Sequence, residues 1–106
     1  MAWVLLCAAG VLEIVFAYFM KASDGFSRLT PAILTIVSGL TSVVLLSMAL
    51  RSLPVGTGYA VWTGIGAAGT AIVGIVFLGD SASASRILCI GLILAGVIGL
   101  KFVSGN

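Results

Sequence analysis

Four long apolar stretches, separated by short polar segments, dominate the pattern of residues along the chain. Each stretch holds about twenty residues, the length that a helix needs to cross the hydrocarbon core of a bilayer. We expect these helices at about residues 2–21, 31–50, 54–78 and 86–103. The pattern predicts an all-α membrane protein with four transmembrane helices, and residues 1–106 are expected to form a single domain.

Local signals set the expected boundaries of the helices. Thr30 and Pro31 predict an N-cap followed by the first helical residue, where proline has no N–H group to leave unpaired. An Asp-Gly pair at residues 24–25 is typical of a turn. Gly64 and Gly66 are poor helix formers in the middle of the third stretch, and they predict a bend at that point.

The composition excludes several classes of protein. Hydrophobic residues make up 61% of the chain and charged residues only 8%, which a soluble domain of this size does not tolerate on its surface. The net charge of +2 does not suggest a nucleic-acid partner. Histidine is absent, and Cys7 and Cys89 stand singly in apolar stretches, so no metal site, cofactor or disulfide framework is expected. We expect both cysteines to be small packing residues.

Glu13 is the acidic residue that lies inside a predicted helix, near the middle of residues 2–21. An ionisable group at the centre of a bilayer costs about 2.5–3.5 kcal/mol on insertion scales, so such residues usually have a function. We therefore interpret Glu13 as a binding site for a proton and a cation in a small transporter. The alternative is a structural glutamate that pairs with a partner helix.

A carboxylate that binds either a proton or a cation, but not both together, supplies what antiport requires. The faces of Phe16, Tyr59 and Trp62 are expected to attract a cation, and the Tyr59 hydroxyl to donate a hydrogen bond to the carboxylate. The substrate is then a monovalent, poorly hydrated organic cation. Most of the Ser and Thr hydroxyls in the second helix are expected to donate hydrogen bonds to the backbone of that helix, as they do in lipid.

Small residues at four-residue spacing form two ridges that let membrane helices pack closely. The ridge on the third helix consists of Gly56, Ala60, Gly64 and Ala68. The ridge on the fourth helix consists of Gly91, Ala95 and Gly99. Lysine and arginine show almost no bias between the two sides of the membrane, so insertion in both orientations is expected. Four helices do not enclose a gated chamber, and we expect an antiparallel pair of chains.

Several segments match a known family over essentially the whole chain. They read MAW at 1–3, GVLE at 10–13, GFSRLTP at 25–31, LPVGTGYAVWTGIG at 53–66 and AGVIGLK at 95–101, together with Lys21. With these segments the chain resembles the small multidrug resistance family, and within it the guanidinium-exporter subtype.

The resemblance implies an antiparallel, dual-topology homodimer in the bacterial inner membrane that exchanges protons for substrate by alternating access. It assigns Glu13 to substrate and proton binding, and Ser42, Tyr59 and Trp62 to the pocket or its hydrogen-bond network. It places a bend at Gly64 and Gly66. Dimer packing is assigned to positions in the fourth helix, namely Gly91, Ala95, Gly96 and Gly99.

Two positions depart from the pattern of that subtype. Phe16 stands where a tryptophan is usual, and Gly58 replaces a usual alanine. A phenyl ring has no N–H donor, so the network around Glu13 loses one hydrogen bond, and the pocket should discriminate less against bulky cations. The leading hypothesis is a proton-coupled exporter of guanidinium and small guanidinyl or related organic cations. The alternatives are a broad multidrug or quaternary ammonium exporter, one subunit of a heterodimeric pair, and a structural membrane protein; an enzyme is not expected.

Overall fold

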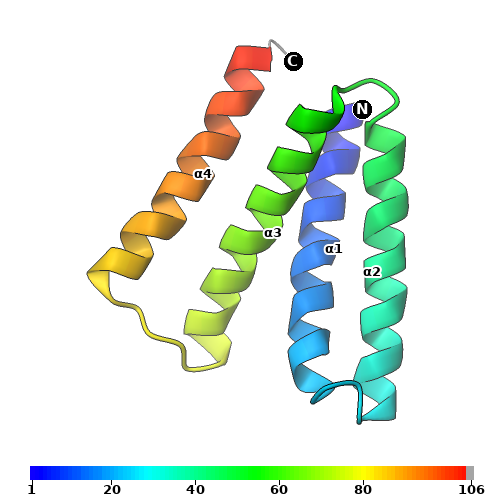
Figure 1. Cartoon of the computed structure of the whole chain (residues 1–106), viewed down its shortest axis with the longest axis vertical. Helices are drawn as coiled ribbons and strands as arrows, with labels where there is room; N and C mark the ends of the chain where they lie inside the picture. Colours follow the sequence, from blue (N-terminus) through cyan, green and yellow to red (C-terminus); the bar gives the residue numbers. More distant parts are fainter. Residues whose placement is uncertain (105–106) are drawn as a thin grey trace.

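The computed structural model describes residues 1–104 and is helical along most of that length. Its four helices are α1 (Ala2–Ala22), α2 (Leu29–Ala49), α3 (Val55–Phe77) and α4 (Ala84–Ser104) (Figure 1). All four are long and apolar enough to cross a membrane. A helix of 21 residues, the length of α1, α2 and α4, spans about 30 Å, which matches the hydrocarbon core of a bilayer. The predicted fold class, four membrane-spanning helices and no strand within residues 1–104, is confirmed.

The start of α2 differs from the prediction. The helix begins at Leu29, its N-cap is Arg28, and no side chain caps it. Thr30 and Pro31 therefore lie inside the first turn, and the predicted N-cap at Thr30 is wrong. Proline is tolerated there because the N–H groups of the whole first turn have no partner within the helix.

The helices are arranged in a single layer, in the order α2, α1, α3, α4 (Figure 1). α1 packs between α2 and α3, whereas α4 packs on α3. The Cα atoms extend over 42 × 34 × 16 Å, so the molecule is thin in one direction. The chain therefore has broad faces that none of its own helices covers.

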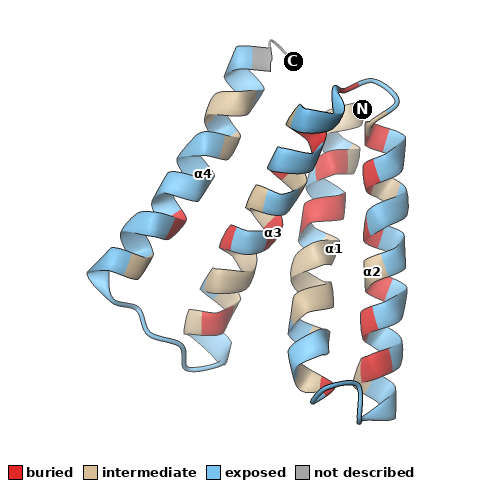
Figure 2. Cartoon of the chain, in the orientation of Figure 1, coloured by how far each residue is buried: buried red, intermediate tan, exposed pale blue. Residues whose placement is uncertain are grey.

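The core lies where α1, α2 and α3 meet, toward the end of the layer that holds the N-terminus (Figure 2). Its buried side chains are Leu6, Ala9, Leu46, Ala49, Leu53 and Val61. At the same end, the Lys101 Nζ lies 5.0 Å from the centroid of the Trp3 ring. That cation–π contact joins the last turns of α4 to the start of α1.

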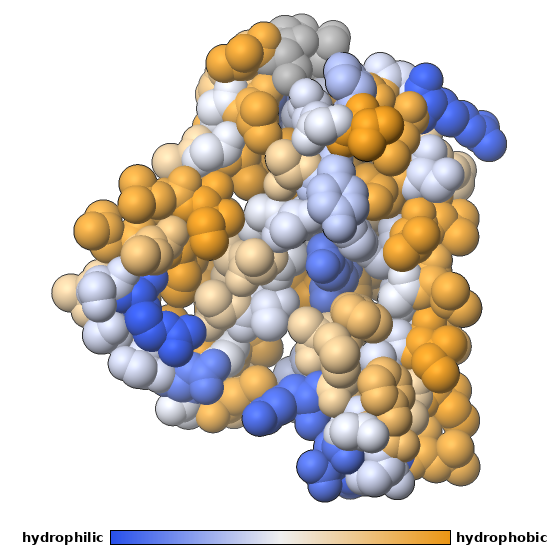
Figure 3. Space-filling model, viewed as in Figure 1, coloured by the Kyte–Doolittle hydropathy of each residue, from blue (hydrophilic) through white to orange (hydrophobic). Residues whose placement is uncertain are grey.

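Many large hydrophobic side chains are exposed, as a lipid environment requires, and on the face seen in Figure 3 they gather along the outer edges of the layer, over α2 and α4. Cys7 and Cys89 belong to these exposed faces and are free, so neither is buried among the helices of this chain. Of residues 84–103 in α4, only Ile90 is buried. A Cβ atom added at Gly91, Gly96 or Gly99 would meet no atom within 4 Å. Together with Ala95, which is exposed, these glycines leave a flat strip on α4 within one protomer.

Candidate functional site

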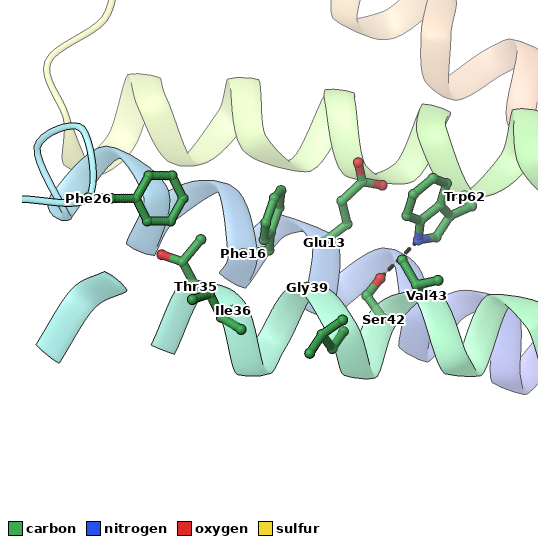
Figure 4. Close-up of a pocket in the computed structure, with 10 residues that line it drawn as sticks. Glu13, Phe16, Phe26, Thr35, Ile36, Gly39, Ser42, Val43 and Trp62 are labelled. Carbon is green, nitrogen blue, oxygen red and sulfur yellow. Dashed lines mark hydrogen bonds between the residues drawn. The ribbon is translucent and has the colours of Figure 1, made fainter. Parts of the chain in front are cut away.

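A cavity of about 310 Å³ opens between α1, α2 and α3 and reaches the loop that joins α1 to α2. Figure 4 shows its lining side chains, with Glu13 between Phe16 on one side and Trp62 on the other. The complete lining is Glu13, Phe16, Phe26, Thr35, Ile36, Gly39, Leu40, Ser42, Val43 and Trp62. Four of the five predicted pocket residues, Glu13, Phe16, Ser42 and Trp62, are therefore brought together. Glu13 is the charged residue of that lining, and most of the other side chains are apolar.

Glu13 is half-buried, and its Oε2 atom is buried without a hydrogen-bond partner among residues 1–104. An unpaired buried carboxylate oxygen is costly, because burial removes the water that would otherwise solvate it. Glu13 therefore keeps an unpaired acceptor at the wall of the cavity.

Gly66 makes room for this carboxylate. Gly66 is buried in α3, and a Cβ atom at this position would come within 2.7 Å of the Glu13 Cδ atom. Real Cβ atoms do not approach other heavy atoms so closely, so any other residue would displace the carboxylate. The absence of a side chain at position 66 is what lets Glu13 lie against α3.

Ser42 connects the three helices beside Glu13. Its hydroxyl donates to the Ala9 carbonyl oxygen at 2.6 Å and accepts a hydrogen bond from the Trp62 Nε1 at 2.9 Å. In an α-helix the carbonyl of residue 9 also accepts the N–H of residue 13. The Ser42 and Trp62 pair is thus linked to the turn of α1 that carries Glu13.

The other hydroxyls of α2 behave as expected for helices in lipid. Thr35 donates to the Pro31 carbonyl at 2.7 Å and Ser38 to the Leu34 carbonyl at 2.7 Å. Thr41 donates to the Val37 carbonyl at 2.8 Å. Among these residues of α2, Ser42 is distinguished because its hydroxyl reaches another helix.

Phe16 packs against the backbone of α2 at Gly39. A Cβ atom at position 39 would come within 2.7 Å of the Phe16 Cδ1 atom. The phenyl ring has no polar atom, so this side of the cavity presents carbon to a ligand. The residue that departs from the guanidinium-exporter pattern therefore contributes an apolar wall next to Glu13.

Tyr59 does not line the cavity. Its side chain is 54% exposed, and its ring lies 5.3 Å from the Trp62 ring, centroid to centroid, at an interplanar angle of 57°. Within residues 1–104 the Glu13 carboxylate receives no hydrogen bond from Tyr59. The expected bond is absent because Tyr59 lies on the uncovered face of α3, so this protomer alone does not support that detail of the prediction.

The glycines expected to bend α3 lie in an uninterrupted α-helix from Val55 to Phe77. Both are sites of close approach. Gly66 faces Glu13, and a Cβ atom at Gly64 would collide with the Val97 side chain of α4. The bend itself stays a prediction, whereas close helix packing at both positions is visible in the structure.

Six of the lining residues had not been singled out for the pocket in the sequence. They are Phe26, Thr35, Ile36, Gly39, Leu40 and Val43. Thr35 and Gly39 lie seven and three residues before Ser42, so a helical projection from Ser42 would have found them. Ile36, Leu40 and Val43 form a second stripe, one residue farther along α2. Phe26 follows the Asp-Gly turn in the loop, and no periodic signal marks it.

Comparison with known proteins places the chain among transporters. The family model for the Small Multidrug Resistance protein matches residues 1–93. A guanidinium exporter of Yersinia pseudotuberculosis is 64% identical over 104 residues, which cover 98% of this chain and 100% of the relative. A guanidinium exporter of Citrobacter freundii is 58% identical over 101 residues, covering 95% and 96%. One of Salmonella typhimurium has the same identity and coverage.

Proposed function

Because the chain belongs to the Small Multidrug Resistance family, we propose that it exports guanidinium and small guanidinyl or related organic cations in exchange for protons. It is a multi-pass protein of the bacterial inner membrane. The observation that carries the proposal is the Glu13 carboxylate, which lines a cavity of about 310 Å³ and whose Oε2 atom is buried without a hydrogen-bond partner.

Glu13 performs the exchange by binding its two ligands in turn. A guanidinium ion presents parallel N–H groups that match the two oxygens of a carboxylate, so the bound cation replaces the proton. A proton arriving from the other side of the membrane then removes the negative charge and releases the cation. Coupling follows because one carboxylate does not hold both.

Ser42 and Trp62 hold the helices in place around Glu13 and do not bind the proton or the cation themselves. The single hydroxyl proton of Ser42 is committed to the Ala9 carbonyl, and the indole N–H is committed to Ser42. Neither group donates to Glu13, so the carboxylate stays free for the substrate. Their role is to hold α1, α2 and α3 at a fixed separation around it.

The working unit is a homodimer of antiparallel chains. A single layer of helices leaves the Glu13 cavity open on one side, and a second copy laid across it would close the chamber. The flat strip on α4 at Gly91, Ala95, Gly96 and Gly99 suits close helix packing between two copies. A heterodimeric pair with a related chain is the alternative assembly.

A second candidate is export of a broader set of cations, including quaternary ammonium ions. Phe16 favours it, because a quaternary ammonium has no N–H group and is bound through aromatic faces and apolar contact. With Phe16 and Trp62 on the two sides of Glu13, the cavity offers both (Figure 4). The two candidates differ in the substrate and share the coupling residue.

The test is a substrate panel on protein reconstituted in liposomes, with transport recorded as proton movement by a pH-sensitive dye inside the vesicles. Gradients of guanidinium and phenylguanidinium are expected to drive protons in the opposite direction. Proton movement of similar size with a tetraalkylammonium would support the broader exporter. No proton movement with guanidinium would contradict the proposal.

A further inference from the structure

The loop between α1 and α2 has an unusual backbone. Three consecutive residues adopt the left-handed region, with φ of 50° at Asp24, 71° at Gly25 and 65° at Phe26. This conformation is easy for glycine but costs energy for a bulky residue such as phenylalanine. Phe26 is therefore held in place by the surrounding structure rather than by its own preference.

Ser23 supplies the structure that holds the loop. Its side chain is fully buried, its hydroxyl donates to the Met20 carbonyl at 2.7 Å, and the same oxygen accepts the Phe26 N–H at 3.1 Å. Its carbonyl accepts the N–H groups of Ser27 and Arg28, each at 3.0 Å. One buried residue thus fixes both sides of the left-handed segment.

The segment turns the Phe26 ring toward the Glu13 cavity. Phe26 lines the cavity, and the order along it in Figure 4 is Phe26, Phe16, Glu13 and Trp62. The Phe26 side chain is 52% exposed, so one part of it faces the cavity and the other part does not. Phe26 stands at the end of the cavity opposite Trp62.

The part of the cavity between Glu13 and Phe26 is apolar. Its one hydroxyl, on Thr35, already donates to the Pro31 carbonyl, and the remaining walls include Phe16 and Ile36. A volume of about 310 Å³ is at the lower end of the range for pockets that take drug-sized ligands, which bury most of their surface there. A guanidinium ion bound at Glu13 leaves most of this space empty.

We propose that Phe26 is a specificity-determining residue of the Glu13 cavity, the end wall that sets how long an apolar substituent the bound cation can carry. Ser23 is the positioning residue that holds this wall. The inference rests on the proposed function, since it assumes that the charged group of the ligand binds at Glu13. It predicts that the α1–α2 loop discriminates between ligands by the length of their apolar substituent and not by their charge.

The experiment is a series of n-alkylguanidinium ions from methyl to octyl, titrated against purified protein at a fixed lipid ratio. Quenching of tryptophan fluorescence reports binding, because Trp62 lines the cavity, and Glu13→Gln protein measures partition into lipid for subtraction. In the wild type, affinity should rise by about fourfold per methylene until the chain meets Phe26, and then level off.

Phe26→Ala should move this plateau to longer chains. Phe26→Leu should give a smaller shift of the plateau. This variant tests the role of Phe26 if the alanine variant does not fold. Ser23→Ala should shift the plateau in the same direction, because it releases the loop. Leu29→Ala is the matched control, since Leu29 is 76% exposed, lies three residues away and does not line the cavity.

Length profiles of the Phe26 variants that superimpose on the wild type, or that fall equally at every length, would overturn the assignment of Phe26. They would leave guanidinium export untouched. Conversely, a shifted plateau in protein that binds these ions but does not exchange guanidinium for protons would support the wall at Phe26 while contradicting the proposed export. The two failures are therefore distinguishable.

Discussion

The carboxylate of Glu13 lies directly against the backbone of Gly66, so that a Cβ atom at position 66 would come within 2.7 Å of the Glu13 Cδ atom. The two residues are on adjacent helices, α1 and α3. The position of the Glu13 carboxylate therefore depends on the absence of a side chain opposite it.

Gly66→Ala should displace the Glu13 carboxylate and weaken cation binding. Overpacking of this kind costs about 1–3 kcal/mol, which corresponds to about 5- to 150-fold in affinity if the whole cost falls on the bound state. Guanidinium affinity in detergent measures it. Gly56→Ala is the matched control, because Gly56 is in the same helix and a Cβ atom there meets nothing within 4 Å. Equal behaviour of the two variants would show that position 66 does not hold the carboxylate.

Ser42→Ala should destabilise the packing of α1, α2 and α3. It removes the acceptor of the Trp62 N–H and the donor to the Ala9 carbonyl, and a buried group left unpaired costs about 1–3 kcal/mol. The free energy of unfolding in mixed micelles is the measurement. Thr41→Ala should change it little, since the Thr41 hydroxyl is exposed and bonds within its own helix. A loss of stability in Thr41→Ala as large as in Ser42→Ala would contradict this account.

The cation–π contact between Lys101 and Trp3 should contribute about 0.5–1 kcal/mol to the attachment of α4 at its C-terminal end. A double-mutant cycle of Lys101→Met and Trp3→Leu, followed by unfolding in mixed micelles, isolates this coupling. Phe102→Ala controls for general effects, because its side chain is 80% exposed. A coupling energy of zero would mean that the two side chains are merely neighbours.

Much of the architecture could be predicted from the sequence because lipid imposes strong rules on it. Four apolar stretches of membrane-spanning length can fold only as helices, and one carboxylate among them is conspicuous. Glu13, Phe16, Ser42 and Trp62 were found through that carboxylate and the family pattern, and all four line one cavity.

Other features depend on geometry that no local pattern encodes. Phe26 reaches the cavity only because three successive residues are left-handed. The expected role of Gly66 was to bend α3, since helix propensity says nothing about which side chain lies opposite a glycine. Tyr59 was placed in the pocket, but its side chain is exposed and does not line the cavity within this chain. A role of Tyr59 in the pocket is to be tested in an assembly of two chains.

The most direct test of the central claim is the Glu13→Gln variant in proton-driven guanidinium transport by proteoliposomes. Glutamine keeps the size of the side chain but removes the charge that a proton and a cation share. We predict a correctly folded dimer, detected by crosslinking, that has lost coupled flux at least 100-fold. Asp80→Asn, which removes an exposed carboxylate in the loop before α4, should transport like the wild type. Coupled flux that persists in Glu13→Gln, or a dimer that fails to assemble, would contradict the assignment of Glu13 as the site of exchange.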